Sequence, residues 1–490
     1  MIEQTQQTID SVLPRAQQRS LLVSTGIPLV VGAAIALLPV PANLSPEAWR
    51  YFALFSAVII GIITEPIPPA AVGLTGVVLA AALGLVGATP AASAAWALSG
   101  FGNTTVWLIF AAYMFALGYA QTGLGKRIAL QLIRMLGSRT LGLAYAITLA
   151  DLLLAPFTPS ITARAGGTIY PVIRSIPELY GSRAHDPSAR KIGSYLLYTA
   201  TSTTLVTGSM FITALAPNAL AIGFIAEGTG LQISWWDWFR GFAPVGFALL
   251  AIVPALLYRI YPPEIREAPE APRWAAAELG AMGPISRREI LLLALVTLAL
   301  TLWIGAAERI EPAMAAILVT VLMVVLRVVS WNDVIGYSQA WNVLIWFATL
   351  VTLAGGLSET KFVPWLADSI GPSLSQLGTT ASIVAVVAVF YVLHYFFASI
   401  TAHTATLFPV FLGIALTIPA VSPMQWALLL AYSLGLMGIL TPYGGGHQAI
   451  YYGSGFIPRR DFWVLGLILG VVYFVVYLVV IVPWLRFLGF

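Results

Sequence analysis

The chain has 490 residues, of which 59% are hydrophobic and only 9% are charged. Ordinary soluble domains carry about 25% charged residues, so this composition excludes a soluble protein. The chain contains no cysteine, which excludes disulfides, thiolate metal sites and cysteine nucleophiles. The net charge of +4 reflects membrane topology, and we expect a lipid bilayer as the partner and no nucleic acid.

Long apolar segments recur along the whole chain. About 20 apolar residues cross the hydrocarbon core of a bilayer. We therefore predict an all-α polytopic membrane protein with about eleven transmembrane helices, over residues 21–38, 48–64, 70–87, 104–122, 194–226, 241–258, 289–305, 312–326, 341–357, 425–452 and 463–484.

Two further apolar regions, 140–175 and 378–417, are too long for a single crossing. A short polar string interrupts each of them in the middle. We interpret both as re-entrant helical hairpins, which membranes tolerate only where protein or a water-filled cavity satisfies the backbone at the tip.

The polar string is the same in both hairpins: Ser-Ile-Thr-Ala at 160–163 and again at 399–402, 239 positions later. The segment 118–122, before the first hairpin, is matched by 356–360 before the second. The first of these segments ends the fourth expected helix and the other follows the ninth, so the two copies run in opposite directions through the membrane. This pattern predicts an inverted-topology repeat.

A long helix broken at a proline follows each hairpin. A helix that stops inside the membrane exposes N–H or C=O groups that can bind ions, and hydroxyl groups add further donors and acceptors. The alternative is that these Ser and Thr residues only support helix packing. The candidate substrate-binding residues lie at the tips and breaks, and they are Ser160, Ile161, Thr162, Ser399, Ile400, Thr401, Pro217, Asn218, Thr441 and Pro442.

The first tip is followed by Arg164 and the second by His403. An arginine inside a membrane costs a few kcal/mol and needs a carboxylate or an anionic ligand. Asp151, on the other arm of the same hairpin, is a possible partner, and in that case Arg164 would be structural. His403 is either a hydrogen-bonded core residue or the functional counterpart of Arg164.

The distribution of positive charge predicts the orientation. With the N-terminus in the cytoplasm, 18 of the 24 Lys and Arg residues are cytoplasmic, so we expect the C-terminus outside. We divide the chain into a first scaffold segment (1–139), a first transport segment (140–258), a linker with the second scaffold segment (259–377), and a second transport segment (378–490).

Four strings resemble the divalent anion:sodium symporter family, in particular its bacterial citrate, tartrate and succinate exchangers: TPSITARAGG at 158–167, YFFASITAH at 395–403, LTPY at 440–443 and YYGSGF at 451–456. The resemblance implies a homodimer of elevator-type transporters in the bacterial cytoplasmic membrane, whose hairpin tips hold substrate carboxylates. Family members carry Ser-Asn-Thr at the tips. Here Ile161 and Ile400 stand in the place of Asn, which removes the amide donors and acceptor.

The resemblance also implies a function, the exchange of di- and tricarboxylate anions. Arg164 and His403 would be fixed positive groups near the family's cation sites, so sodium is not expected to be required, and no cofactor or metal is expected. A sodium- or proton-coupled symporter of the same fold is the alternative. An intramembrane enzyme or a channel is more distant, since the chain has four histidines and lacks a His-Glu-x-x-His motif.

Overall fold

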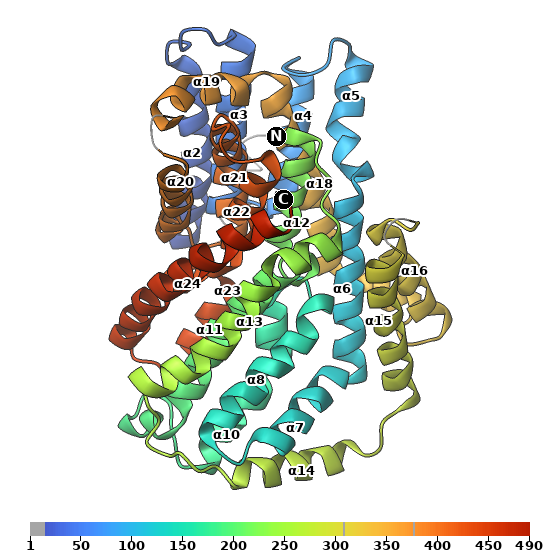
Figure 1. Cartoon of the computed structure of the whole chain (residues 1–490). Coiled ribbons are helices and arrows are strands. Elements are labelled where there is room, and N and C mark those ends of the chain that lie inside the picture. The colour runs from blue at the N-terminus through green and yellow to red at the C-terminus, as the bar shows by residue number, and fades with distance from the viewer. Residues whose placement is uncertain (1–14, 307–308, 376–377) are drawn as a thin grey trace. The chain divides into compact units, whose positions relative to one another are not determined.

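The computed structural model describes residues 15–306, 309–375 and 378–490 (Figure 1). Within these residues the regular elements are helices, together with one isolated β-bridge between Arg139 and Glu267. The predicted all-α class is confirmed. The chain divides into two compact units, one of Met1–Asn103 with Asn342–Ile370 and the other of Thr104–Trp341 with Gly371–Phe490.

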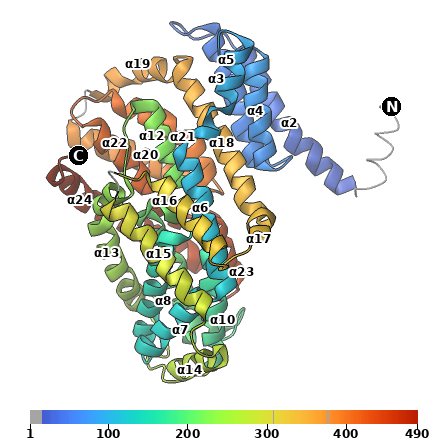
Figure 2. The same ribbon diagram turned by 90° about the vertical axis from the view of Figure 1, so that its right-hand side faces the viewer.

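The first unit is a helical bundle with close packing (Figure 2). Tyr51 donates a hydrogen bond from its hydroxyl to the carbonyl oxygen of Leu353 at 2.7 Å. Gly73 has no room for a side chain, because a Cβ atom there would lie 2.1 Å from Oγ1 of Thr349. The unit consists of α2 (Arg15–Leu37), α3 (Pro46–Thr64), α4 (Pro69–Ala82), α5 (Pro90–Leu98), and most of α18 (Ser338–Glu359) and α19 (Phe362–Ser375).

The second unit contains both hairpins and both broken helices. Its helices are α6 (Thr104–Thr122), α7 (Leu124–Leu136), α8 (Thr140–Leu154), α9 (Ile161–Arg164), α10 (Tyr170–Leu179), α11 (Gly193–Met210), α12 (Ala216–Thr229), α13 (Trp235–Ile260), α14 (Glu270–Met282), α15 (Arg287–Gly305), α16 (Pro312–Val325), α17 (Trp331–Gly336), α20 (Thr379–Leu393), α21 (Ile400–Leu416), α22 (Pro423–Leu436), α23 (Gly446–Gly453) and α24 (Arg459–Phe487).

The helices that could cross a membrane are identified by their length and apolar composition. In the described part of the chain, nine helical segments are long and apolar enough to cross a membrane. Two of the nine, Thr140–Phe157 and Thr379–Phe396, are the first arms of the hairpins, and four shorter apolar helices accompany them. A helix or a broken helix lies over each of the eleven expected ranges.

The two hairpins enter the second unit from opposite ends (Figure 1). The first runs through α8 to its tip and returns through α9, a π-helical turn at Ala165–Ile169, and α10. The second runs through α20 to its tip and returns through α21. This arrangement is the one expected of an inverted repeat.

Both long helices after the hairpins are interrupted, as predicted. The first breaks between α11 and α12, and Pro217 lies in the first turn of α12, where a missing N–H leaves no helical bond unmade. The second ends in a 3-10 turn, Met437–Leu440, and resumes as α23 at Gly446.

The linker that joins the two halves of the chain contains a helix as well as loops. Helix α14 lies beneath α7 and α10, at the end of the unit from which the first hairpin enters (Figure 1). Just before α14, the carbonyl oxygens of Ile265 and Arg266 accept hydrogen bonds from the hydroxyl and the N–H of Thr140, at 2.7 and 2.9 Å. The linker is thereby tied to the first residue of α8.

Candidate functional site

The two hairpin tips have the same local structure. Ser160 and Ser399 are the N-cap residues of α9 and α21, and each side-chain oxygen accepts the backbone N–H three residues later, at 3.1 and 3.3 Å. An N-cap serine of this kind begins a helix by satisfying one of its free donors. Both serines and Thr401 are half-buried and Thr162 is exposed, so the four hydroxyl groups predicted to contact substrate can face a ligand.

The two isoleucines point the other way. Ile161 and Ile400 are 3% and 5% exposed, and each packs against a glycine of a broken helix. A Cβ atom at Gly208 would lie 2.6 Å from Cδ1 of Ile161, and one at Gly438 would lie 3.1 Å from Cδ1 of Ile400. Both isoleucines are among the predicted substrate contacts. Their apolar side chains fill the packing between tip and broken helix, because burial removes them from water.

An amide side chain holds each helix break together. Asn218 donates from Nδ2 to the carbonyl oxygens of Gly208 and Phe211 at 2.7 and 2.9 Å. Gln448 donates from Nε2 to the carbonyl oxygen of Gly438. In both breaks the amide follows its glycine acceptor by 10 residues. The amide oxygens, Oδ1 of Asn218 and Oε1 of Gln448, are buried and have no hydrogen-bond partner among the described residues.

These bonds make Gln448 the structural equivalent of Asn218. The two breaks are therefore not equivalent by their prolines, because the residue that follows Pro442 is Tyr443. Pro442 lies in the turn before α23 rather than inside a helix. Beside it, Oγ1 of Thr441 is buried and has no partner in the part of the chain that the structure describes.

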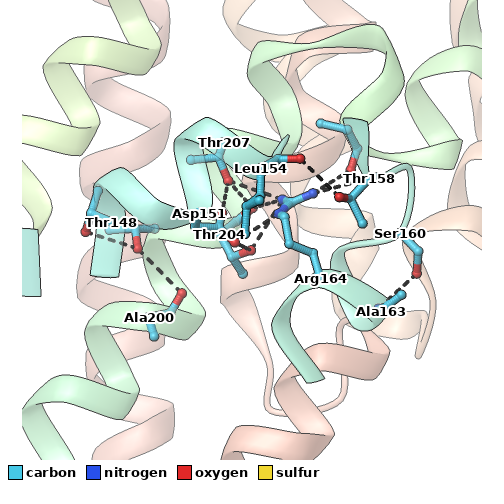
Figure 3. A network of polar contacts seen from close by, with 12 residues as sticks. Thr148, Asp151, Leu154, Thr158, Ser160, Ala163, Arg164, Ala200, Thr204 and Thr207 are labelled. Carbon is cyan, nitrogen blue, oxygen red and sulfur yellow. Dashed lines mark hydrogen bonds and ion pairs between the residues drawn. The ribbon is translucent and has the colours of Figure 1, made fainter. Parts of the chain in front are cut away.

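Arg164 forms a buried ion pair with Asp151, the possible partner on the other arm of its hairpin (Figure 3). Its Nε donates to Oδ1 of Asp151 at 2.9 Å. Thr204 and Thr207 on α11 complete the network, with hydroxyl groups 3.4 and 3.3 Å from Nη2 of the arginine. The same two hydroxyls donate to Oδ1 and Oδ2 of the aspartate. Compensation by Asp151 explains how a guanidinium can be buried here.

The same guanidinium joins the first tip to the first helix break. Nη1 of Arg164 donates to the carbonyl oxygen of Thr158 at 2.9 Å and to that of Ala214 at 3.2 Å. Thr158 lies two residues before the serine of the tip, and Ala214 lies between α11 and α12. Carbonyl, hydroxyl and carboxylate oxygens are the ligands of hard cations. Arg164 therefore places a permanent positive charge among oxygens that could otherwise hold a cation.

The mirrored position in the second hairpin is aromatic. His403 is fully buried and packs edge-on against Phe390, with 4.5 Å between ring centroids. Phe397 and His394 are the next rings, at 5.1 and 5.3 Å. Both ring nitrogens of His403 lack a partner among the described residues. His394 reaches the second break, with Nε2 3.0 Å from the carbonyl oxygen of Gly444.

Several residues of the site were missed by sequence reasoning. Thr204 and Thr207 belong to a run of hydroxyl residues on α11, and the whole of that helix is buried. A run of polar residues in an otherwise apolar membrane segment indicates a functional site, and the sequence contained this signal. Tyr113 on α6 carried no such signal, yet its side chain lies close to that of Ser160.

Re-entrant hairpins and broken helices whose polar tips and helix breaks adjoin define a membrane transporter of the inverted-repeat class. Residues 19–490 match the family model described as the sodium:sulfate symporter transmembrane region. The chain belongs to this family, the divalent anion:sodium symporters.

Named relatives and one solved structure agree with this assignment. The L-tartrate/succinate antiporter of Escherichia coli (strain K12) is 45% identical over 470 residues, which are 94% of this chain and 96% of the relative. The citrate/succinate antiporter of the same strain is 46% identical over 469 residues, 92% and 96% of the two chains. The crystal structure of the Alcanivorax borkumensis YdaH transporter aligns with a TM-score of 0.53 at 16% identity, over 97% of this chain and 99% of that one, and shows likeness of fold alone.

Proposed function

We propose that this protein exchanges di- and tricarboxylate anions across the bacterial cytoplasmic membrane without a requirement for sodium. The observation that carries the proposal is the position of Arg164, whose guanidinium engages the carbonyl oxygens of Thr158 and Ala214 between the first tip and the first break. A side chain that is always charged takes the place of a cation that would have to be bound and released. The names of the relatives support exchange and the carboxylate class.

The carboxylates of the substrate would be held by the tips. The hydroxyls of Ser160, Thr162, Ser399 and Thr401 can each donate to a carboxylate oxygen, and these charge-assisted bonds are the strong ones. Tyr113 lies beside Ser160 and adds a further donor at the first tip. Ile161 and Ile400 would contribute by fixing the tips in place rather than by touching the anion.

Exchange would be obligatory for a reason that does not depend on the charge of Arg164. Because Asp151 compensates Arg164, the empty carrier does not hold an unpaired guanidinium. The cost of returning empty would instead arise at the tips and breaks, where hydroxyl and N–H donors would cross the membrane without partners. A second carboxylate removes that cost, and transport in one direction then requires transport in the other.

We further propose an elevator mechanism in a homodimer, with the N-terminus in the cytoplasm and the C-terminus outside. The transport segments 140–258 and 378–490 would move together, and both lie within the second compact unit. The excess of Lys and Arg on one side supports the orientation. The dimer and the elevator motion rest on the family resemblance.

The deciding experiment is uptake of labelled succinate, tartrate and citrate into liposomes that contain the purified protein. The vesicles are either empty or loaded with unlabelled succinate, and the buffer contains either choline or sodium. We expect uptake only into loaded vesicles and equally in both buffers. Robust sodium-dependent uptake into empty vesicles would replace this proposal with a sodium-coupled symporter.

A further inference from the structure

Asp151 places one fixed negative charge directly behind the first tip. It is 2% exposed, and both carboxylate oxygens accept hydrogen bonds, Oδ1 from Arg164 and Thr204, and Oδ2 from Thr207. The guanidinium that it faces contacts the carbonyl of Thr158, two residues from the serine of the tip. An anion bound at that tip therefore feels the charges of both members of the pair.

No other buried carboxylate shares this position in the part of the chain that the structure describes. Glu289 on α15, the other acidic residue buried among those that the structure describes, pairs with Arg127 on α7 at 2.5 Å. The position that mirrors Asp151 in the second hairpin is occupied by Phe390, which has no charge. The repeat thus contains one compensated cation in the first half and no acidic group at the equivalent place in the second.

We propose that Asp151 determines which charge state of substrate the site prefers. It reduces the attraction that Arg164 exerts on an anion and so favours dianions such as succinate over trianions such as citrate. This inference rests on the proposed exchange of carboxylates. The relatives do not decide the point, since one is named for tartrate and another for citrate at almost equal identity.

The size of the effect follows from Coulomb's law. A unit charge about 10 Å from another, at an effective dielectric constant of about 20, changes an affinity by roughly tenfold. Removing the charge of Asp151 therefore strengthens the binding of every anion, and it strengthens that of a trianion about tenfold more than that of a dianion. The ratio of the two affinities reports the charge, whereas damage to the site lowers both.

The test compares Asp151→Asn with the wild type in vesicles loaded with succinate. Unlabelled citrate and unlabelled succinate each compete with labelled succinate, at an alkaline pH where citrate is a trianion. We expect the citrate-to-succinate ratio of inhibitory concentrations to fall about tenfold in the variant. Thr148→Val is the matched control, because Thr148 lies on the same helix and its hydroxyl bonds with Ala144 and Thr203, outside the ion pair. Its ratio should equal that of the wild type.

A second measurement does not depend on transport. Citrate and succinate each raise the melting temperature of the detergent-solubilised protein when they bind. The two rises give the ratio of the two affinities without a transport assay. Arg164→Gln leaves Asp151 uncompensated and should shift the ratio in the opposite direction, while Asp151→Glu should keep the wild-type ratio. If Asp151→Asn does not fold, the citrate-to-succinate ratio measured in Arg164→Gln by thermal melting tests the role of Asp151 by itself.

The outcomes separate the two proposals. An unchanged ratio in Asp151→Asn, or in Arg164→Gln where that variant decides, overturns the role of Asp151 while exchange by the wild type stands. A wild type that neither binds nor exchanges any of these carboxylates overturns the proposed function and this inference together. A tenfold shift in the citrate-to-succinate ratio that occurs only in Asp151→Asn and Arg164→Gln, in opposite directions, supports the proposed function and the role of Asp151.

Discussion

Arg164 and Asp151 are paired inside the first hairpin, with Nε of the arginine 2.9 Å from Oδ1 of the aspartate. The positions that mirror them in the second hairpin hold His403 and Phe390 in edge-to-face contact. The repeat therefore preserves the geometry of the two half-sites but not their charge. The first half holds a compensated cation and the second an aromatic pair.

Replacing Arg164 tests its role as a substitute for a coupling cation. Arg164→Gln should abolish exchange, because it leaves a buried carboxylate unpaired, at a cost of about 3–5 kcal/mol. Arg164→Lys should restore exchange only in part, since an ammonium lacks the planar fork that reaches two carbonyls and the carboxylate together. The measurement is succinate exchange in liposomes with choline buffer, with reconstituted protein quantified for each variant. Exchange at the wild-type rate in Arg164→Gln would remove Arg164 from the mechanism.

The smaller variant Arg164→Ala gives a complementary result. It leaves a carboxylate and several neutral oxygens around an emptied space, and such oxygens suit a hard cation. We expect sodium to raise its residual transport while leaving the wild type unchanged. Equal rates in sodium and choline would show that the oxygens around Arg164 cannot hold an ion.

The hydroxyls of the tips are tested by Thr162→Ala and Thr401→Ala. Each variant should weaken substrate binding by about 1–3 kcal/mol, which is the cost of unpairing a hydrogen bond to a charged group. Thr406→Val is a suitable control, because that hydroxyl donates to the carbonyl oxygen of Ala402 in its own helix, at 2.7 Å. Titration of exchange against succinate concentration measures the effect. Unaltered affinity in both tip variants would make the repeated string a packing motif.

The equivalence of the two helix breaks predicts matched losses of stability. Asn218→Ala removes two hydrogen bonds and Gln448→Ala removes one, so we expect about 1–3 kcal/mol for each carbonyl left unpaired and a larger effect at Asn218. Thermal unfolding in detergent provides the measurement. Thr301→Ala, at an exposed hydroxyl on α15, should leave the melting temperature nearly unchanged. A larger effect at Gln448 than at Asn218 would contradict the bonding described for the breaks.

The orientation can be tested with single cysteines, because the chain has none of its own. Cysteines that replace Ala184 and Arg273 should react with a membrane-impermeant thiol reagent only from the cytoplasm. Those that replace Ala92 and Ser422 should react only from outside. Reaction of both pairs from the same side would rule out the inverted repeat. Whole cells and inside-out vesicles supply the two directions of labelling.

Much of the fold was readable from the sequence because it depends on local composition. Runs of about 20 apolar residues predicted the spans, and the duplicated string at 160–163 and 399–402 predicted both hairpins. The breaks were located as well, since a proline cannot continue a helix without losing a hydrogen bond. These features need no knowledge of which helices touch.

The orientation of side chains was decided only by the tertiary structure. In a membrane protein the residues that face lipid and those that face other helices are both apolar, so hydropathy does not distinguish the two faces. The sequence therefore could not show that Ile161 turns toward Gly208, or that Asn218 is the equivalent of Gln448. It offered Asp151 as one possible partner for Arg164. The choice of that partner, with Thr204 and Thr207 from α11, was made by the packing of helices, because a buried charge is stable only where other groups satisfy every one of its hydrogen bonds.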